Sequence, residues 1–169
     1  MSNRNHDEYI DKMIHYWTGL AVMRWYRGYQ AGDITIFEDG ESHFDAPDWQ
    51  VQIRHEDLIM IFLAGVLMTA PWILTHPELV IYDNRDAPDM RRVRDLLTHD
   101  YRRDRLPPQD MGVISEDDAV RFYLERVIDI MTEPFIVGCC QDVQEALSEN
   151  LSLSGDAIDR LLNELEANA

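Results

Sequence analysis

The sequence predicts a mainly α protein of the α+β class, a single helical domain with a small β-sheet or hairpin. Several long segments carry apolar residues at helical spacing, whereas residues 33–37 alternate β-branched residues as a strand does. A chain of 169 residues that is 46% apolar and 28% charged also has the composition of one globular domain. We therefore expect one domain over residues 1–169, with a core in 6–105 and C-terminal helices in 115–167.

The elements around the predicted strand follow from periodicity and from turn residues. Residues 6–27 have apolar side chains every three or four positions, which predicts a helix that Gly28 ends. After the strand, residues 38–52 are predicted as an acidic loop or weak hairpin, because Asp39-Gly40 is a turn signal.

A membrane span is the alternative for the next segment. The stretch from Leu58 to Thr75 carries no charge and approaches the length of a transmembrane helix. It contains Gly65 and Pro71 and lacks cationic anchors, so we expect a buried core helix over residues 54–69 that ends near Pro71, and no membrane.

Four more helices are predicted toward the C-terminus. An amphipathic Arg/Asp-rich helix covers residues 86–105, and Pro107-Pro108 break the chain after it. The last three helices are 116–131 with Ser115 as N-cap, 134–149 beginning at Pro134, and 155–166 with Ser154 as N-cap. Because apolar faces need partners, we expect helix 6–27 to pack on helices 54–69 and 86–105.

The charge is strongly negative and unevenly placed. With 32 acids against 15 bases the net charge is −17, which argues against direct binding of nucleic acid. Residues 30–60 carry a net charge of −7 and residues 110–169 one of −11. The acids chosen as a candidate binding surface are Glu38, Asp39, Glu41, Glu116, Asp117 and Asp118.

Two interpretations of this acidity stay open. Concentrated negative charge steers a basic protein partner, and such binding weakens with salt. On this interpretation, reversing the charges of Glu116, Asp117 and Asp118 slows association. Alternatively, the acids are a solvated face that provides solubility, or they reflect a salt-adapted source.

The common catalytic motifs are absent from the sequence. It contains no HExxH, no GxSxG, no Gly-rich phosphate loop and no CxxC, and its six histidines show no metal-ligand spacing. Cys139 and Cys140 are adjacent, which excludes a disulfide framework, and the apolar neighbours of Cys139 favour a buried, inert thiol. The first dozen residues are polar and indicate no signal peptide, so we expect a cytoplasmic protein.

Five segments, taken in order, resemble the FtsH-type zinc metallopeptidases. Residues 12–22 (KMIHYWTGLAV) resemble that family's active helix, in which His-Glu-Ala-Gly-His-Ala-Val follows an apolar lead-in. Residues 33–37 resemble its next strand, and residues 63–65 (LAG) its buried helix. Residues 88–93 (PDMRRV) resemble the helix that supplies an Asp ligand, and residues 153–158 (LSGDAI) the closing LSGEEI segment.

The resemblance implies the fold and argues against the activity. Tyr16 stands at the first ligand His, Trp17 at the general-base Glu and Leu20 at the second ligand His, so only Asp89 keeps the type of a ligand. Zinc hydrolysis needs both a Lewis acid and a proton acceptor. We therefore expect no catalytic residue, no metal and no cofactor.

Two function hypotheses follow. The first is a binding or inhibitory protein on a peptidase-like fold that engages a basic, nucleic-acid-binding protein. A concrete form of it is a phage or mobile-element inhibitor of a host defence enzyme. The second is a metal-dependent hydrolase or peptidase with a relocated site that uses Asp89 and a histidine such as His15.

Overall fold

The fold is taken from a computed structural model. It describes residues 2–39, 41–45, 53–77, 88–101 and 115–169. The break predicted at Pro107-Pro108 lies outside the described residues.

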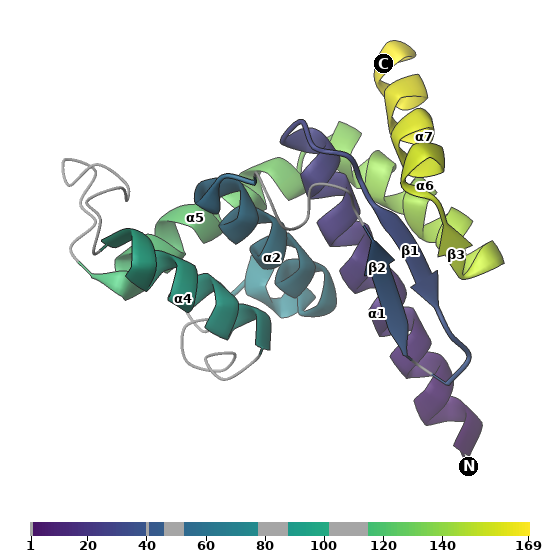
Figure 1. Cartoon of the computed structure of the whole chain (residues 1–169), viewed down its shortest axis with the longest axis horizontal. Helices are drawn as coiled ribbons and strands as arrows, with labels where there is room; N and C mark the ends of the chain where they lie inside the picture. The colour runs from purple at the N-terminus through teal and green to yellow at the C-terminus, as the bar shows by residue number, and fades with distance from the viewer. Residues whose placement is uncertain (1, 40, 46–52, 78–87, 102–114) are drawn as a thin grey trace.

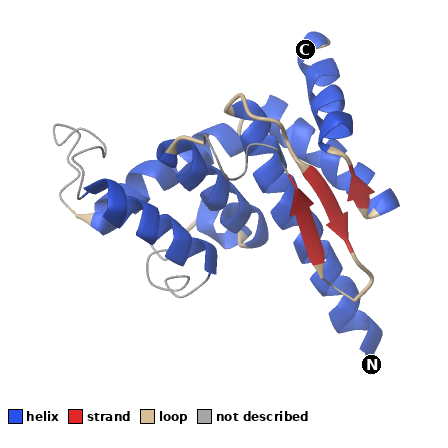
Figure 2. Cartoon of the chain, viewed as in Figure 1, coloured by secondary structure: helices blue, strands red, loops and turns tan. Residues whose placement is uncertain are grey.

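The predicted class is confirmed, because the chain is mostly helical with one small antiparallel sheet (Figures 1 and 2). The helices are α1 (Ser2–Tyr26), α2 (His55–Thr69), the 3₁₀ turn η1 (Pro71–Leu74), α4 (Pro88–Tyr101), α5 (Glu116–Met131), α6 (Pro134–Asn150) and α7 (Gly155–Ala167). The strands are β1 (Asp33–Ile36), β2 (Ser42–Asp45) and β3 (Ser152–Leu153), in the spatial order β2-β1-β3.

The predicted helix ends are confirmed by local hydrogen bonds and backbone angles. Gly28 follows α1 with a φ of +88°, which glycine adopts without a steric penalty. The Ser115 hydroxyl accepts a hydrogen bond of 3.1 Å from the backbone N–H of Asp118, and the Ser154 hydroxyl accepts one of 3.1 Å from Ala157. Both serines therefore satisfy backbone donors in the first turns of α5 and α7.

The hairpin is present, and the sheet contains a strand that the sequence did not predict. β2 pairs antiparallel with β1, with Ile34 opposite Phe44. On the other edge of β1, Ile34 lies opposite Leu153 of β3. β3 has two residues, too few to show alternation, so periodicity could not have found it.

The helix packing differs in part from the expectation. α1 packs on α2 as predicted, but its second large neighbour is α6, whereas α4 packs on α2 and α5. α1 and α4 meet at Tyr16 and Asp89, whose side chains are hydrogen-bonded. The physical reason is that α2 is buried on most of its surface and packs against the apolar face of α4. The face of α1 that does not contact α2 therefore packs on α6.

Close approach of α1 and α2 depends on small residues. A Cβ atom at Gly19 would lie 2.7 Å from the backbone oxygen of Ala64. A Cβ at Gly65 would lie 2.3 Å from a Leu20 methyl carbon and 2.8 Å from the Tyr16 ring. These distances are shorter than real Cβ contacts, so both positions require glycine.

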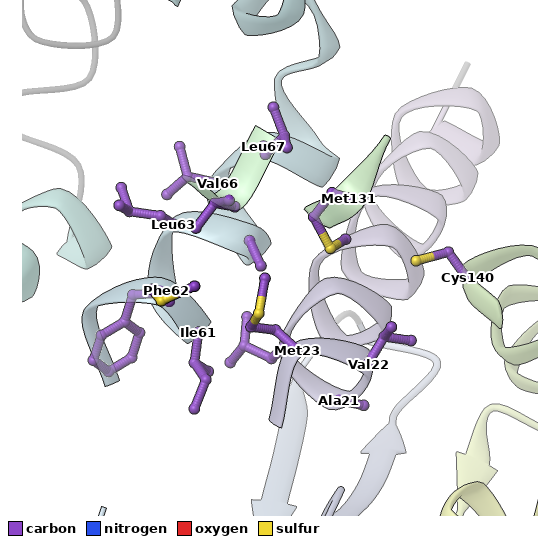
Figure 3. Close-up of a cluster of buried hydrophobic side chains, with 14 of the residues drawn as sticks. Ala21, Val22, Met23, Ile61, Phe62, Leu63, Val66, Leu67, Met131 and Cys140 are labelled. Carbon is purple, nitrogen blue, oxygen red and sulfur yellow. The ribbon is translucent and has the colours of Figure 1, made fainter. Parts of the chain in front are cut away.

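The core is contributed mainly by α1, α2, α5 and α6, with further buried side chains from β1, α4 and α7. Figure 3 shows Val22 and Met23 of α1, Ile61 and Leu63 of α2 and other labelled side chains gathered between these helices. The run Ile59–Leu67 is buried throughout, as predicted for a core helix. None of the described helices combines the length and apolar character needed to cross a bilayer.

Candidate functional site

Tyr16 and Asp89 are far apart in the sequence, but the fold places their side chains in contact. The Tyr16 hydroxyl donates a hydrogen bond to the Asp89 carboxylate, which also lies 3.7 Å from the Arg92 guanidinium. This contact lies at the edge of a hollow of about 470 Å³ that is also lined by Lys12 and Trp72. Another polar group of the hollow, the Thr69 hydroxyl, donates to the backbone oxygens of Gly65 and Val66.

Burial controls the protonation of the Tyr16–Asp89 pair. It raises the pKa of Tyr16 well above that of a free phenol, and the hydrogen bond to Asp89 raises this pKa further. Burial also raises the pKa of Asp89, although the bond from Tyr16 and the charge of Arg92 act in the opposite direction. The phenol therefore stays protonated near neutral pH and acts as a hydrogen-bond donor to the carboxylate.

Trp17 has a packing role. Its ring lies edge-on to Tyr16 at 5.0 Å between centroids, and it stacks on Phe44 of β2 at 5.2 Å with a 10° interplanar angle. The ring thereby fastens the hairpin to α1. The indole has an N–H donor and no basic atom, so it cannot accept a proton as a general base would.

Leu20 fills the space between α1 and α2. It is 1% exposed and lies against Gly65, and its side chain offers no donor atom. Within the part of the chain that the structure describes, no three His, Cys, Asp or Glu side chains converge in a way that could hold a metal ion. Asp89 is the one residue that keeps the side-chain type of a metal ligand in the resemblance. Its carboxylate is hydrogen-bonded to Tyr16 and does not lie among other ligand side chains of the described residues.

The remaining candidates from the sequence are His15, as a metal ligand, and Cys139, as a nucleophile. His15 is half-buried on α1, next to Tyr16 in sequence. Cys139 and Cys140 are buried and free, as predicted. Burial raises the pKa of both thiols, that of Cys140 to about 12, so neither is activated as a nucleophile.

Two of the predicted surface acids, Glu116 and Asp117, form ion pairs with an arginine of the same chain. Arg94 of α4 donates to the carboxylates of Glu116 at 2.7 Å and Asp117 at 2.9 Å. These pairs connect α4 to the first turn of α5, where negative charge is also favourable to the helix dipole. Glu116 and Asp117 therefore present less negative charge to a partner than their sequence indicates. Asp118 follows them in the same turn and is half-buried.

The predicted acids of the hairpin lie on its turn. Glu38, Asp39 and Glu41 are exposed, and the Asp39 carboxylate accepts a hydrogen bond of 3.0 Å from the backbone N–H of Glu41. Figure 1 places this turn and the start of α5 at different ends of the molecule. The two sets of predicted acids thus belong to separate regions.

A third acidic region lies within residues 110–169, which carry a net charge of −11, but none of its acids is among the six candidate surface residues. Helices α6 and α7 carry seven acids and one arginine, a net charge of −6. Glu145, Glu149, Glu164 and Glu166 are exposed, and no ion pair of theirs is recorded among the described residues. The sequence signal was the near-absence of bases after residue 133, where Arg160 is the single cation.

An aromatic groove adjoins this third region and was missed. It has a volume of about 800 Å³, and Trp25, Tyr26, Tyr29 and Phe135 contribute to its lining. The available signal was the crowding of three aromatic residues around the helix stop at Gly28, which is more than one helix face can bury.

Comparison of the chain with protein-family models, curated proteins and solved structures gives no match.

Proposed function

We propose that this protein is a non-catalytic binding protein that engages a basic protein partner through an acidic surface. The observation that carries the proposal is the set of exposed carboxylates Glu145, Glu149, Glu164 and Glu166 on α6 and α7, which form no ion pair within the part of the chain that the structure describes. Like charges gathered on one surface repel each other and are relieved by a cation. A partner with Lys- and Arg-rich surface supplies that relief, whereas a nucleic acid adds to the repulsion.

The absence of a catalytic role is supported by what the candidate residues do. Tyr16 and Asp89 bond to each other, Trp17 packs on Phe44, and Leu20 fills the contact between two helices. These contacts give each of the side chains a structural role within the fold. Inhibition of a nucleic-acid-binding enzyme, including a host defence enzyme blocked by a phage or mobile-element protein, is the specific form of this proposal.

Binding should be tested with the whole chain as bait in an extract of its source, followed by kinetics with the purified partner. The proposal predicts a basic partner and an association rate that falls at least tenfold between about 50 and 200 mM salt, because exposed charges are screened. At a given salt concentration, the double variant Glu145→Gln, Glu149→Gln should have a lower association rate than the unmodified chain. Replacing Glu116 or Asp117 is a poorer test, since it also breaks the pairs with Arg94.

A metal and cleavage assay addresses the catalytic alternative. Untagged protein should contain no stoichiometric zinc and should not cleave casein in a chelator-sensitive manner. Stoichiometric zinc, or cleavage that a chelator stops, would overturn the proposal in favour of a hydrolase with a relocated site. A partner that is acidic, or that binds equally at all salt concentrations, would overturn the electrostatic part.

A further inference from the structure

The groove at the end of α1 is built from aromatic walls and acidic margins. Trp25 and Tyr26 come from the last turn of α1, Tyr29 from the residues after it, and Phe135 from the first turn of α6. Two acids of α7, Asp159 and Glu166, also line it. Figure 1 shows α7 extending away from the helical body, with the C-terminus at its tip.

Hydrogen bonds join the elements that line the groove. The Trp25 indole N–H donates to the side-chain oxygen of Asn163 at 2.9 Å and so connects α1 to α7. The base of α7 is tied to the chain after α1, where the backbone N–H of Ala31 donates to Asp159 at 3.0 Å. The Trp25 and Phe135 rings lie 6.5 Å apart with a 53° tilt, within the range of interacting aromatic pairs, so together they form an aromatic wall of the groove.

The chemistry of the lining selects a cation. Tyr26 is 41% exposed, so its ring is accessible to a ligand in the groove. Aromatic faces attract cations, and the exposed Glu166 carboxylate adds a negative charge to the same space. A purely apolar ligand would leave the Glu166 carboxylate without a partner, and an anion would be repelled by it.

Arginine fits these groups better than lysine does. A guanidinium is planar, stacks on aromatic rings and offers a fork of donors to a carboxylate, whereas an ammonium is a compact and strongly hydrated point charge. The groove volume of about 800 Å³ exceeds what one side chain fills and lies within the range of sites that hold a drug-sized ligand. Room therefore remains for the residues that flank the arginine.

We propose that this groove binds an arginine side chain, with its flanking residues, on an exposed segment of the basic protein partner. This inference rests on the proposed function and specifies where and through which residue type the partner is held. The acids elsewhere on α6 and α7 then steer the segment, and the groove fixes it.

The test uses two fluorescein-labelled twelve-residue peptides, one alternating Arg with Ala and one alternating Lys with Ala, titrated into the full chain. We expect the Arg peptide to bind several-fold more tightly than the Lys peptide. In NMR spectra it should shift the indole N–H signal of Trp25 and leave unchanged that of Trp17, whose indole nitrogen is buried. Tyr26→Ala and Glu166→Gln, which alter exposed side chains, should each weaken the Arg peptide about three- to tenfold.

The outcomes separate this inference from the proposed function. Salt-sensitive binding that does not distinguish Arg from Lys, and that Tyr26→Ala leaves unchanged, would overturn the groove while keeping the acidic surface. The absence of binding by either peptide at low salt would overturn both. The double variant Glu145→Gln, Glu149→Gln is the matched control, because it should weaken both peptides equally and leave the preference for Arg intact.

Discussion

Helix α1 carries two pairs of adjacent tyrosine and tryptophan residues whose surroundings differ. Tyr16 and Trp17, in mid-helix, are engaged by the protein itself: the phenol bonds to Asp89, and the indole stacks on Phe44. Trp25 and Tyr26, at the helix end, line an open groove with acids beside them. The same residue types therefore stabilise the fold in one place and form a candidate binding surface in the other, depending on whether a partner element covers them.

The polar groups of the two regions differ in the same way. Around Tyr16 the phenol, the carboxylate and the Thr69 hydroxyl find partners inside the molecule. Around Tyr26 the neighbouring helices carry exposed carboxylates such as Glu166. The difference is therefore one of available charge: the Tyr16–Asp89 contact is made inside the molecule, although the Trp17 indole N–H has no hydrogen-bond partner among the described residues, whereas the groove presents the exposed Glu166 carboxylate to a cation.

The largest expected effect comes from installing zinc ligands in mid-helix. The triple variant Tyr16→His, Trp17→Glu, Leu20→His should lose at least about 3–5 kcal/mol of unfolding free energy, because it empties packed volume and buries polar groups. Urea unfolding followed by circular dichroism measures the loss. Tyr26→His in the groove is the control and should cost less than about 1 kcal/mol. A triple variant with wild-type stability would show that the mid-helix region is not a packed contact.

A smaller loss is expected where α1 and α2 cross. Gly19→Ala should cost about 1–3 kcal/mol, since its Cβ would lie 2.7 Å from a backbone oxygen that cannot rotate away. Gly138→Ala on α6 is the matched control, because a Cβ there meets nothing within 4 Å. It should raise stability by up to about 1 kcal/mol through helix propensity. Equal responses of the two variants would contradict the close approach of α1 and α2.

The protonation of Asp89 gives a pH-dependent effect of known sign. Because burial raises its pKa in the folded state, the folded protein holds this proton more tightly than the unfolded chain. This contribution to stability is present below the ordinary Asp pKa and is lost as pH rises through the raised value. Asp89→Asn keeps an acceptor for Tyr16 and should therefore gain stability relative to wild type as pH rises from about 4 toward neutrality. A variant that becomes relatively less stable over that range would contradict this assignment.

The smallest effect concerns the cysteines. With a pKa of about 12, Cys140 has a thiolate fraction of about 10⁻⁴ at pH 8, and Cys139 is only 1% exposed. Neither thiol should react with Ellman's reagent in the native protein, and both should react once urea unfolds the chain. Rapid reaction of one thiol in native buffer would indicate an accessible nucleophile and would revive a catalytic role for Cys139.

Much of the fold was predictable because its signals are local. The caps Ser115 and Ser154, the stop at Gly28 and the turn after Phe37 each act within a few residues, and the structure contains all of them. β3 was not predictable, because a two-residue strand exists through its pairing with β1. The packing of α1 on α6 also depends on which of several similar apolar faces meet, which periodicity does not encode.

The candidate sites were predictable only in part, for the same reason. Glu116 and Asp117 were chosen for their charge, but their pairing with Arg94 depends on α4 lying beside α5. Trp25 was assigned to an apolar helix face, and its position at the groove wall follows from where α7 leaves the sheet. Sequence identifies the residue types, and tertiary packing decides which of them remain available.

The comparison between the middle and the C-terminal end of α1 is tested most directly by measuring two properties on two variants. Tyr16→Phe should lower the unfolding free energy by about 1–2 kcal/mol, because the Asp89 carboxylate loses a hydrogen bond, and should leave the affinity for the Arg peptide unchanged. Tyr26→Ala should leave stability within about 0.5 kcal/mol and weaken the peptide about three- to tenfold. The account is contradicted if Tyr16→Phe abolishes peptide binding at unchanged stability, or if Tyr26→Ala lowers stability and leaves binding intact.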